Sequence, residues 1–238
     1  MFKNVREALI LGGSFLLGAI LTGLLFSTTA INFKEYERTV VAKGLSEKEV
    51  PADIAIWPIQ FTVTGNDLNT IYQTLEQNTN KILNFLTSNG FDRSELSYSS
   101  PSITDKLANQ YQESKVELRF VAGQSITVYT NKVDLVRSVK TKIVKLGREG
   151  IMFGGSNYNH QNTEYLFTKL NDIKPSMIEE ATRKAREVAE KFATDSNSKL
   201  GKIKSARQGQ FSIQNRDQNT PYIKKVRVVS TVEYYLSD

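Results

Sequence analysis

The sequence contains no cysteine and only one histidine, and these two scarcities exclude several kinds of chemistry. Without cysteine the chain has no disulfide, no thiolate metal site, no redox-active thiol and no N-terminal cysteine for lipid attachment. With His160 as the only imidazole, a histidine-rich metal site is excluded as well. No Walker or dinucleotide-binding glycine pattern follows a predicted strand. We therefore expect no cofactor, although a carboxylate-only Ca²⁺ or Mg²⁺ site stays open.

Charge is absent from Ala8 to Phe33, and the stretch from Ala8 to Phe26 is almost wholly apolar. At 1.5 Å of helix rise per residue, about 19 such residues span roughly 28 Å, close to the ~30 Å of a bilayer core. The pattern predicts a signal-anchor or transmembrane helix within residues 1–33, followed by a polar connector over residues 34–38.

Cleavage of this segment is the alternative, because Thr28 and Ala30 are small residues at the spacing that a signal peptidase recognises. The apolar run is longer than the ~7 to 15 residues usual in signal peptides, which favours the anchor. A short N-terminal tail before a long domain predicts one pass through a membrane, with the tail inside and the domain outside. Cleavage would instead release the domain from the membrane.

Residues 39–238 show the patterns of a single α+β domain. Trp57, Ile59, Phe61 and Val63 alternate along one face of a predicted strand. Strands that run into Asn- or Asp-containing helix starts recur near residues 61–67, 126–131 and 167–172, which suggests repeated strand-helix units. The expected fold is a largely antiparallel sheet with three helices packed on one face.

Each predicted helix has recognisable boundary residues. For the first, Asn66 or Asp67 is the expected cap and Asn89-Gly90 the end. For the second, Asn131 is the expected cap. The third has Pro175 in its first turn and the clearest apolar repeat. Its expected buried positions are Ile178, Ala181, Ala185, Val188 and Phe192.

Positive charge is concentrated near the C-terminus, although the whole chain has a net charge of only +6. A basic region of this kind favours contact with anionic surfaces such as lipid headgroups or an acidic partner, while nucleic acid is not an expected partner. A solvated strand and loop surface explains the same residues. The candidate contact residues are Lys199, Lys202, Lys204, Arg207, Lys224, Lys225 and Arg227.

Few residues suggest catalysis. Ser156 and His160 are close in sequence, but the G-x-S-x-G turn of a serine hydrolase is missing. A pocket that gathered Asp53, Glu95 and Glu164 would favour a hydrolase or a saccharide-acting enzyme. Tyrosines near basic residues offer surfaces on which saccharides or bases could stack. These tyrosines are Tyr111, Tyr158, Tyr165, Tyr222, Tyr234 and Tyr235.

In their order and spacing, several short motifs resemble those of the SIMPL-domain (DUF541) family, in its bacterial branch with an N-terminal membrane segment. The resemblance extends from about Thr39 to the end. The motifs are Val40–Gly44, Glu49–Trp57, Gly65–Leu68, Tyr165–Pro175, the Ala181–Ala193 helix with Leu200-Gly201, and Lys225–Val229.

This resemblance implies an envelope or periplasmic protein that is connected with stress tolerance, and for some members it implies ring-like oligomers. It implies no catalytic residues. With the membrane segment, the resemblance implies a single pass through a bacterial inner membrane with the domain in the periplasm, or release into the periplasm if the segment is cleaved. We therefore expect a membrane-anchored protein that acts by self-association or partner binding rather than by catalysis. The alternatives are a periplasmic hydrolase or saccharide-acting enzyme, and a module that binds anionic ligands.

Overall fold

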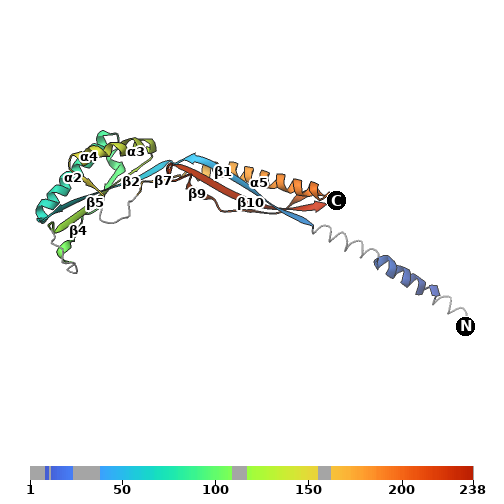
Figure 1. Cartoon of the computed structure of the whole chain (residues 1–238). Coiled ribbons are helices and arrows are strands. Elements are labelled where there is room, and N and C mark those ends of the chain that lie inside the picture. The colour runs from blue at the N-terminus through green and yellow to red at the C-terminus, as the bar shows by residue number, and fades with distance from the viewer. Residues whose placement is uncertain (1–8, 11, 24–37, 109–116, 155–161, 238) are drawn as a thin grey trace. The chain divides into compact units, whose positions relative to one another are not determined.

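A computed structural model describes residues 9, 10, 12–23, 38–108, 117–154 and 162–237 of the chain (Figure 1). Its strands are β1 Thr39–Pro51, β2 Ile54–Gly65, β3 Leu96–Tyr98, β4 Ser102–Asp105, β5 Phe120–Thr130, β6 Met152–Phe153, β7 Glu164–Leu166, β8 Lys199–Gln208, β9 Ser212–Asn215 and β10 Ile223–Ser237. Its α-helices after residue 38 are α2 Leu68–Ser88, α3 Val133–Lys140, α4 Val144–Arg148 and α5 Leu170–Asp195. Short 3₁₀ turns cover Arg93–Glu95, Lys106–Ala108 and Thr141–Ile143.

The chain divides into two compact units, each assembled from separate stretches of sequence. Unit 1 comprises Met1–Lys48, Ile173–Ser212 and Arg227–Asp238, and unit 2 comprises Glu49–Asp172 and Ile213–Val226. Each unit has its own cluster of buried apolar residues.

The core of unit 2 is built on β2, a long strand in the middle of a six-stranded sheet. β2 pairs antiparallel with β5 over its full length and with β6 and β7 on its other side. The predicted alternation is confirmed: Trp57, Ile59, Phe61 and Val63 are all buried. Pro58, which has no N–H to donate, lies between the stretches of β2 that pair with β6 and β7.

Helix α2 packs on this sheet in agreement with its sequence. Asp67 caps its first turn by accepting a hydrogen bond from the Thr70 backbone N–H at 2.8 Å, and the helix ends before Asn89 and Gly90. Gly90 has φ of 100°, a conformation that glycine adopts without strain. The start and the end predicted for this helix are therefore confirmed.

The second predicted helix differs from expectation in two ways. It is divided into α3 and α4 by a 3₁₀ turn, and Lys132 rather than Asn131 occupies the cap position, with no side-chain capping bond. Its inward residues still include Val136, Val139 and Leu146, which are buried against the sheet.

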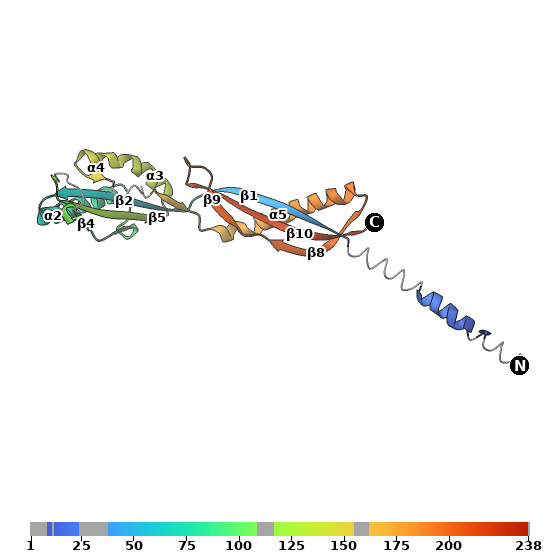
Figure 2. The same cartoon turned by 60° about the horizontal axis from the view of Figure 1, so that its bottom comes forward.

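In unit 1, α5 covers one face of the sheet in which β10 lies between β1 and β8 (Figure 2). The helix buries five residues at intervals of four. They are Met177, Ala181, Ala185, Ala189 and Ala193. The predicted burial of Val188 and Phe192 is wrong, since their side chains are 40% and 56% exposed. Ile178 is half-buried.

Small residues explain this orientation of α5. A Cβ on Gly44 of β1 would lie 1.8 Å from the Ala181 carbonyl oxygen and 2.4 Å from the Ala185 nitrogen. The helix and the strand therefore approach so closely that only small side chains fit between them. The larger Val188 and Phe192 face away because this contact has no room for them.

The fold class is α+β with antiparallel pairing, as predicted, but the single sheet with three helices on one face is wrong. The described residues form a four-stranded and a six-stranded sheet, and α5 packs on a different sheet from α2 and α3. All three predicted strand-helix junctions do join a strand to a helix, namely β2 to α2, β5 to α3 and β7 to α5.

The predicted membrane segment falls only partly within the described residues. Residues 12–23 are helical, but no described helix has both the length and the apolar character needed to span a bilayer. The candidate cleavage residues Thr28 and Ala30 lie outside the described part of the chain.

Candidate functional site

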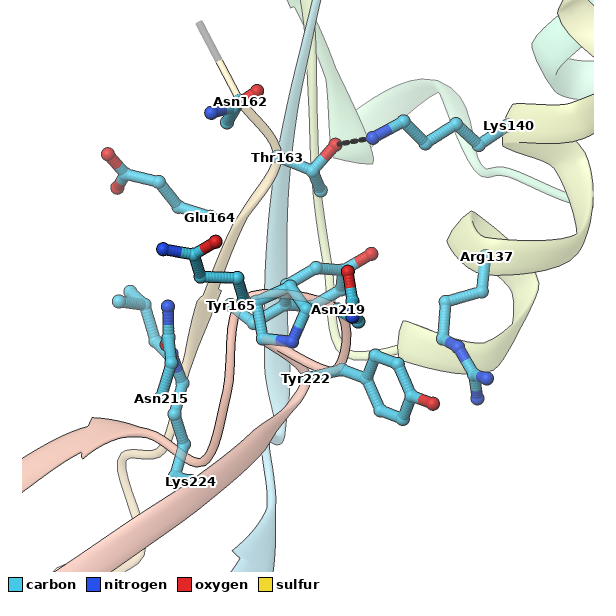
Figure 3. A pocket seen from close by; sticks show the side chains of 13 residues that line it. Arg137, Lys140, Asn162, Thr163, Glu164, Tyr165, Asn215, Asn219, Tyr222 and Lys224 are labelled. Atoms are coloured by element: carbon cyan, nitrogen blue, oxygen red, sulfur yellow. Dashed lines mark hydrogen bonds between the residues drawn. The ribbon is translucent and has the colours of Figure 1, made fainter.

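A pocket of about 1030 Å³ opens on the surface of unit 2 (Figure 3). Three stretches of sequence line it: α3, residues 162–166 at β7, and residues 215–224 between β9 and the start of β10. Its lining is rich in cationic, amide and tyrosine side chains, which Figure 3 shows converging from both the helix and the hairpin.

Backbone pairing brings these distant stretches together. Tyr165 of β7 pairs with Ala55 of β2, and the Ala52 N–H donates to the Tyr222 carbonyl at 2.8 Å. The hairpin turn is fixed by Asp217, which accepts hydrogen bonds from the backbone N–H groups of Asn219 and Thr220. The lining residues of the hairpin therefore lie on a well-braced loop.

Tyr222 and Arg137 form the aromatic side of the pocket. The Arg137 guanidinium carbon lies 3.7 Å from the centre of the Tyr222 ring, and the Tyr165 ring meets Tyr222 edge-to-face at 6.1 Å. One Arg137 nitrogen also bonds to the Asp134 carboxylate at 2.9 Å. The guanidinium is thus held over the face of an aromatic ring, a cation–π contact that helps to fix the orientation of Arg137.

Two lysines approach the pocket and bond to neutral partners. Lys140 Nζ donates to Thr163 Oγ1 at 2.9 Å, and Lys224 Nζ donates to the Asn215 amide oxygen. Lys224 is only 8% exposed, and burial lowers the pKa of its ammonium while the charge of Glu164 opposes that shift. Burial similarly raises the pKa of the Tyr165 hydroxyl, with the Arg137 charge opposing that shift.

The seven predicted anionic-surface contacts are divided between the two units, with Lys224 and Lys225 in unit 2 and the other five in unit 1. Lys204 pairs with Glu233 and Arg227 pairs with Glu47, each at 3.3 Å. The remaining unit 1 residues of the set, Lys199, Lys202 and Arg207, are exposed on β8. The structure therefore places Lys224 alone of the seven in the pocket lining. Contact of the set with an anionic surface stays a prediction.

The three candidate carboxylates have separate surroundings. Asp53 accepts hydrogen bonds from the backbone N–H and the hydroxyl of Thr168. These bonds fix the loop that precedes α5. Glu95 accepts hydrogen bonds from Thr130 and Lys132. Only Glu164 of the three lines the pocket described above.

The other candidate residues lie in different parts of the chain. Ser156, His160, Tyr111 and Tyr158 lie outside the described residues. Tyr234 is buried and Tyr235 exposed in unit 1, whereas Tyr165 and Tyr222 contribute to the pocket. No group of three or more potential metal ligands occurs within the described parts of the chain.

Sequence reasoning missed Arg137, Lys140 and the amides of the pocket. They come from segments far apart in the chain, and no local motif connects them. The available signal was the presence of tyrosines near basic residues, which identified Tyr165 and Tyr222 but not their neighbours.

The sequence matches a known protein family. The sequence profile of SIMPL, described as a protein of unknown function (DUF541), matches residues 40–233. The chain belongs to the SIMPL family. The match spans β1 through most of β10, so the SIMPL region includes residues of both units. No curated protein matches the chain.

Proposed function

We propose that this SIMPL protein is a membrane-tethered envelope protein that acts by self-association through unit 1, without catalysis of its own. The tether is supported by the uncharged stretch from Ala8 to Phe26. Tolerance of envelope or oxidative stress, which the family resemblance implies, is the process that we propose it serves.

The observation that carries the proposal is the open face of the unit 1 sheet. α5 covers one face, and on β1 the residues that alternate with the buried Ala42 point the other way. Val41 and Leu45 are 58% and 36% exposed there. The exposed Lys43 lies between these two apolar residues, and Glu47 pairs with Arg227, so the face mixes apolar and charged side chains, as the surfaces that other proteins cover commonly do.

The edge of the same sheet adds a second route to association. β1 spans 13 residues and has β10 as its one partner among the described strands. The unpaired N–H and C=O groups of a long edge strand can pair with a strand of another chain. A second copy of the protein would offer the same face and the same edge, as a two-fold interface requires.

The test is the oligomeric state of the full chain in a nonionic detergent, measured by analytical ultracentrifugation. We expect a species larger than the monomer, and V41K should shift it toward monomer because a charge would have to be buried in the interface. V144K is the matched control, since Val144 of unit 2 is 59% exposed. A monomer at micromolar concentration, or equal effects of V41K and V144K, would contradict the proposal.

The tether has its own test. N-terminal sequencing of the protein from the membrane fraction should give the unprocessed chain. A mature chain that begins at Ile31 would replace the anchor with a cleaved signal peptide and would leave self-association through unit 1 to be judged separately.

A further inference from the structure

The geometry of the unit 2 pocket points to a binding site, and we propose that it binds a saccharide that carries a carboxylate group. This inference is independent of self-association, because every lining residue of the pocket belongs to unit 2. It follows from the charge of the pocket, the orientation of its guanidinium group, the chemistry of its amides and its size.

The charge of the lining favours an anion. Arg137, Lys140 and Lys224 contribute three positive charges to the lining, against one negative charge from Glu164. Asp134, which does not line the pocket, pairs with Arg137 and offsets part of its charge. Within the described residues, Glu164 forms no ion pair with any of them, and both lysines bond to uncharged oxygens. Their charges are therefore available to an anionic group that enters the pocket.

Arg137 favours a carboxylate in particular. Its guanidinium is planar and lies against Tyr222, while only one of its nitrogens bonds to Asp134. The remaining N–H groups can donate two parallel hydrogen bonds to a carboxylate, and the stacked ring has already restricted the rotation of the side chain. In Figure 3, Lys140 extends from α3 to Thr163, and Arg137 of the same helix lies beside the Tyr222 ring.

The amides favour a ligand with many hydroxyl groups. Asn162, Asn215, Gln218 and Asn219 all line the pocket. Each amide both donates and accepts hydrogen bonds, as does a sugar hydroxyl, so each can satisfy a hydroxyl in either sense. Leu166 and Pro221 add apolar surface against which the C–H groups of a sugar ring can pack.

The size of the pocket argues against a very small acid. A volume of about 1030 Å³ lies just above the range of about 300 to 1,000 Å³ that is usual for ligand sites. A single small carboxylic acid would leave most of the amides unoccupied. Two or three sugar rings would contact both the α3 side and the hairpin side of the pocket.

The experiment is isothermal titration calorimetry on the full chain in nonionic detergent at about 150 mM salt, where exposed charges are largely screened. The probes are a galacturonic acid trisaccharide, its fully methyl-esterified form and citrate. The ester keeps the rings but loses the charge, whereas citrate keeps the carboxylates but loses the rings. We expect the acid trisaccharide to bind at least about tenfold more tightly than either of the others.

Variants then locate the site. R137Q and K140Q should each weaken binding of the acid trisaccharide by about tenfold, because each removes a charge-assisted hydrogen bond. K142Q is the matched control, since Lys142 is exposed in the turn that follows α3 and does not line the pocket. The fluorescence of Trp57, which is buried in unit 2, reports whether each variant remains folded. Should R137Q unfold, K140Q and the probe comparison still decide the outcome.

Three results would overturn the proposal. The first is no binding of the acid trisaccharide up to about 10 mM, a concentration above which affinity is too weak to be specific. The second is equal binding of the methyl ester or of citrate, which would remove the charge or the saccharide from recognition. The third is an equal loss in K142Q and K140Q, which would indicate general attraction to a basic surface.

Discussion

The two units attach a helix to a sheet in different ways. Unit 2 fills the space between layers with large side chains, such as Trp57, Phe61, Ile82 and Leu86. Unit 1 instead brings α5 so close to β1 that glycine and alanine occupy most of the contact. Its buried cluster is correspondingly small and consists of Ala42, Ala185, Ala189, Val232 and Tyr234. The comparison indicates that unit 2 is sensitive to lost volume and unit 1 to added volume.

The largest effect should come from removing volume in unit 2. F61A deletes a fully buried ring from the central strand, and we expect the free energy of unfolding to fall by about 3 to 5 kcal/mol. Chemical denaturation of the full chain, followed by Trp57 fluorescence, measures this loss. A loss below about 1 kcal/mol would show that the core tolerates a cavity and would remove the contrast between the units.

Adding volume in unit 1 should have the next largest effect. G44A places a methyl group where the backbone of α5 already lies, and we expect a loss of about 2 to 3 kcal/mol, measured by circular dichroism during denaturation. G123A is the control, because the nearest atom to a Cβ at Gly123 in β5 is 3.9 Å away. Similar stability of the two variants would mean that the helix and strand separate easily.

Acid should weaken unit 2 through Glu95. Burial raises the pKa of this carboxyl, but hydrogen bonds from Thr130, the Asp92 backbone and Lys132 together outweigh it and hold the pKa below its usual value of 4.5. A lowered pKa in the folded state gives stability that is present above about pH 4.5 and is lost as the pH falls below it.

The measurement compares wild type with E95Q between about pH 6 and pH 3. Near pH 6 the variant should be less stable by about 1 kcal/mol, and the difference should shrink on acidification as the wild-type carboxylate becomes protonated. A difference that stays constant with pH would show that the Glu95 charge does not contribute.

The smallest effect should come from F192A. Phe192 is 56% exposed on the outer side of α5, so we expect a change within about 0.5 kcal/mol. F61A and F192A remove the same side chain from the two units, and denaturation under identical conditions compares them directly. A loss above about 2 kcal/mol in F192A would mean that the outer face of α5 is covered, for instance by another copy of the protein.

How much could be predicted from the sequence depended on how local the signal was. The alternation in β2 and the Asp67 cap are local patterns, and both are confirmed. The inward face of α5 was predicted correctly at Ala181 and Ala185. It was predicted wrongly at Val188 and Phe192, because the close approach of the helix to Gly44 is a tertiary constraint that hydrophobicity does not reveal. The sequence does not predict β8, because its apolar residues Leu200, Ile203 and Ala206 recur every three residues and do not alternate as in a strand.

The candidate site depends even more on contacts between distant segments, which local sequence patterns do not reveal. Tyr165 and Tyr222 were predicted as stacking surfaces, and Lys224 separately as an anionic-surface contact. Nothing local connects these residues with Arg137 on α3. The pairing of β7 with β2 and the backbone bond from Ala52 to Tyr222 bring these segments together. Such long-range pairing is a property of the whole sheet, which a short stretch of sequence does not reveal.

The alanine stripe of α5 has a consequence for how the helix finds its axial position. Four alanines at intervals of four residues give nearly the same surface after a slide of about 6 Å, so apolar packing alone would accept several positions. Two features distinguish one of them: the space above Gly44, and the hydrogen bond that the fully buried Ser46 donates to Glu180 at 2.7 Å. The close fit over Gly44 and this one polar bond together therefore select one alignment among several that the alanine stripe alone would accept.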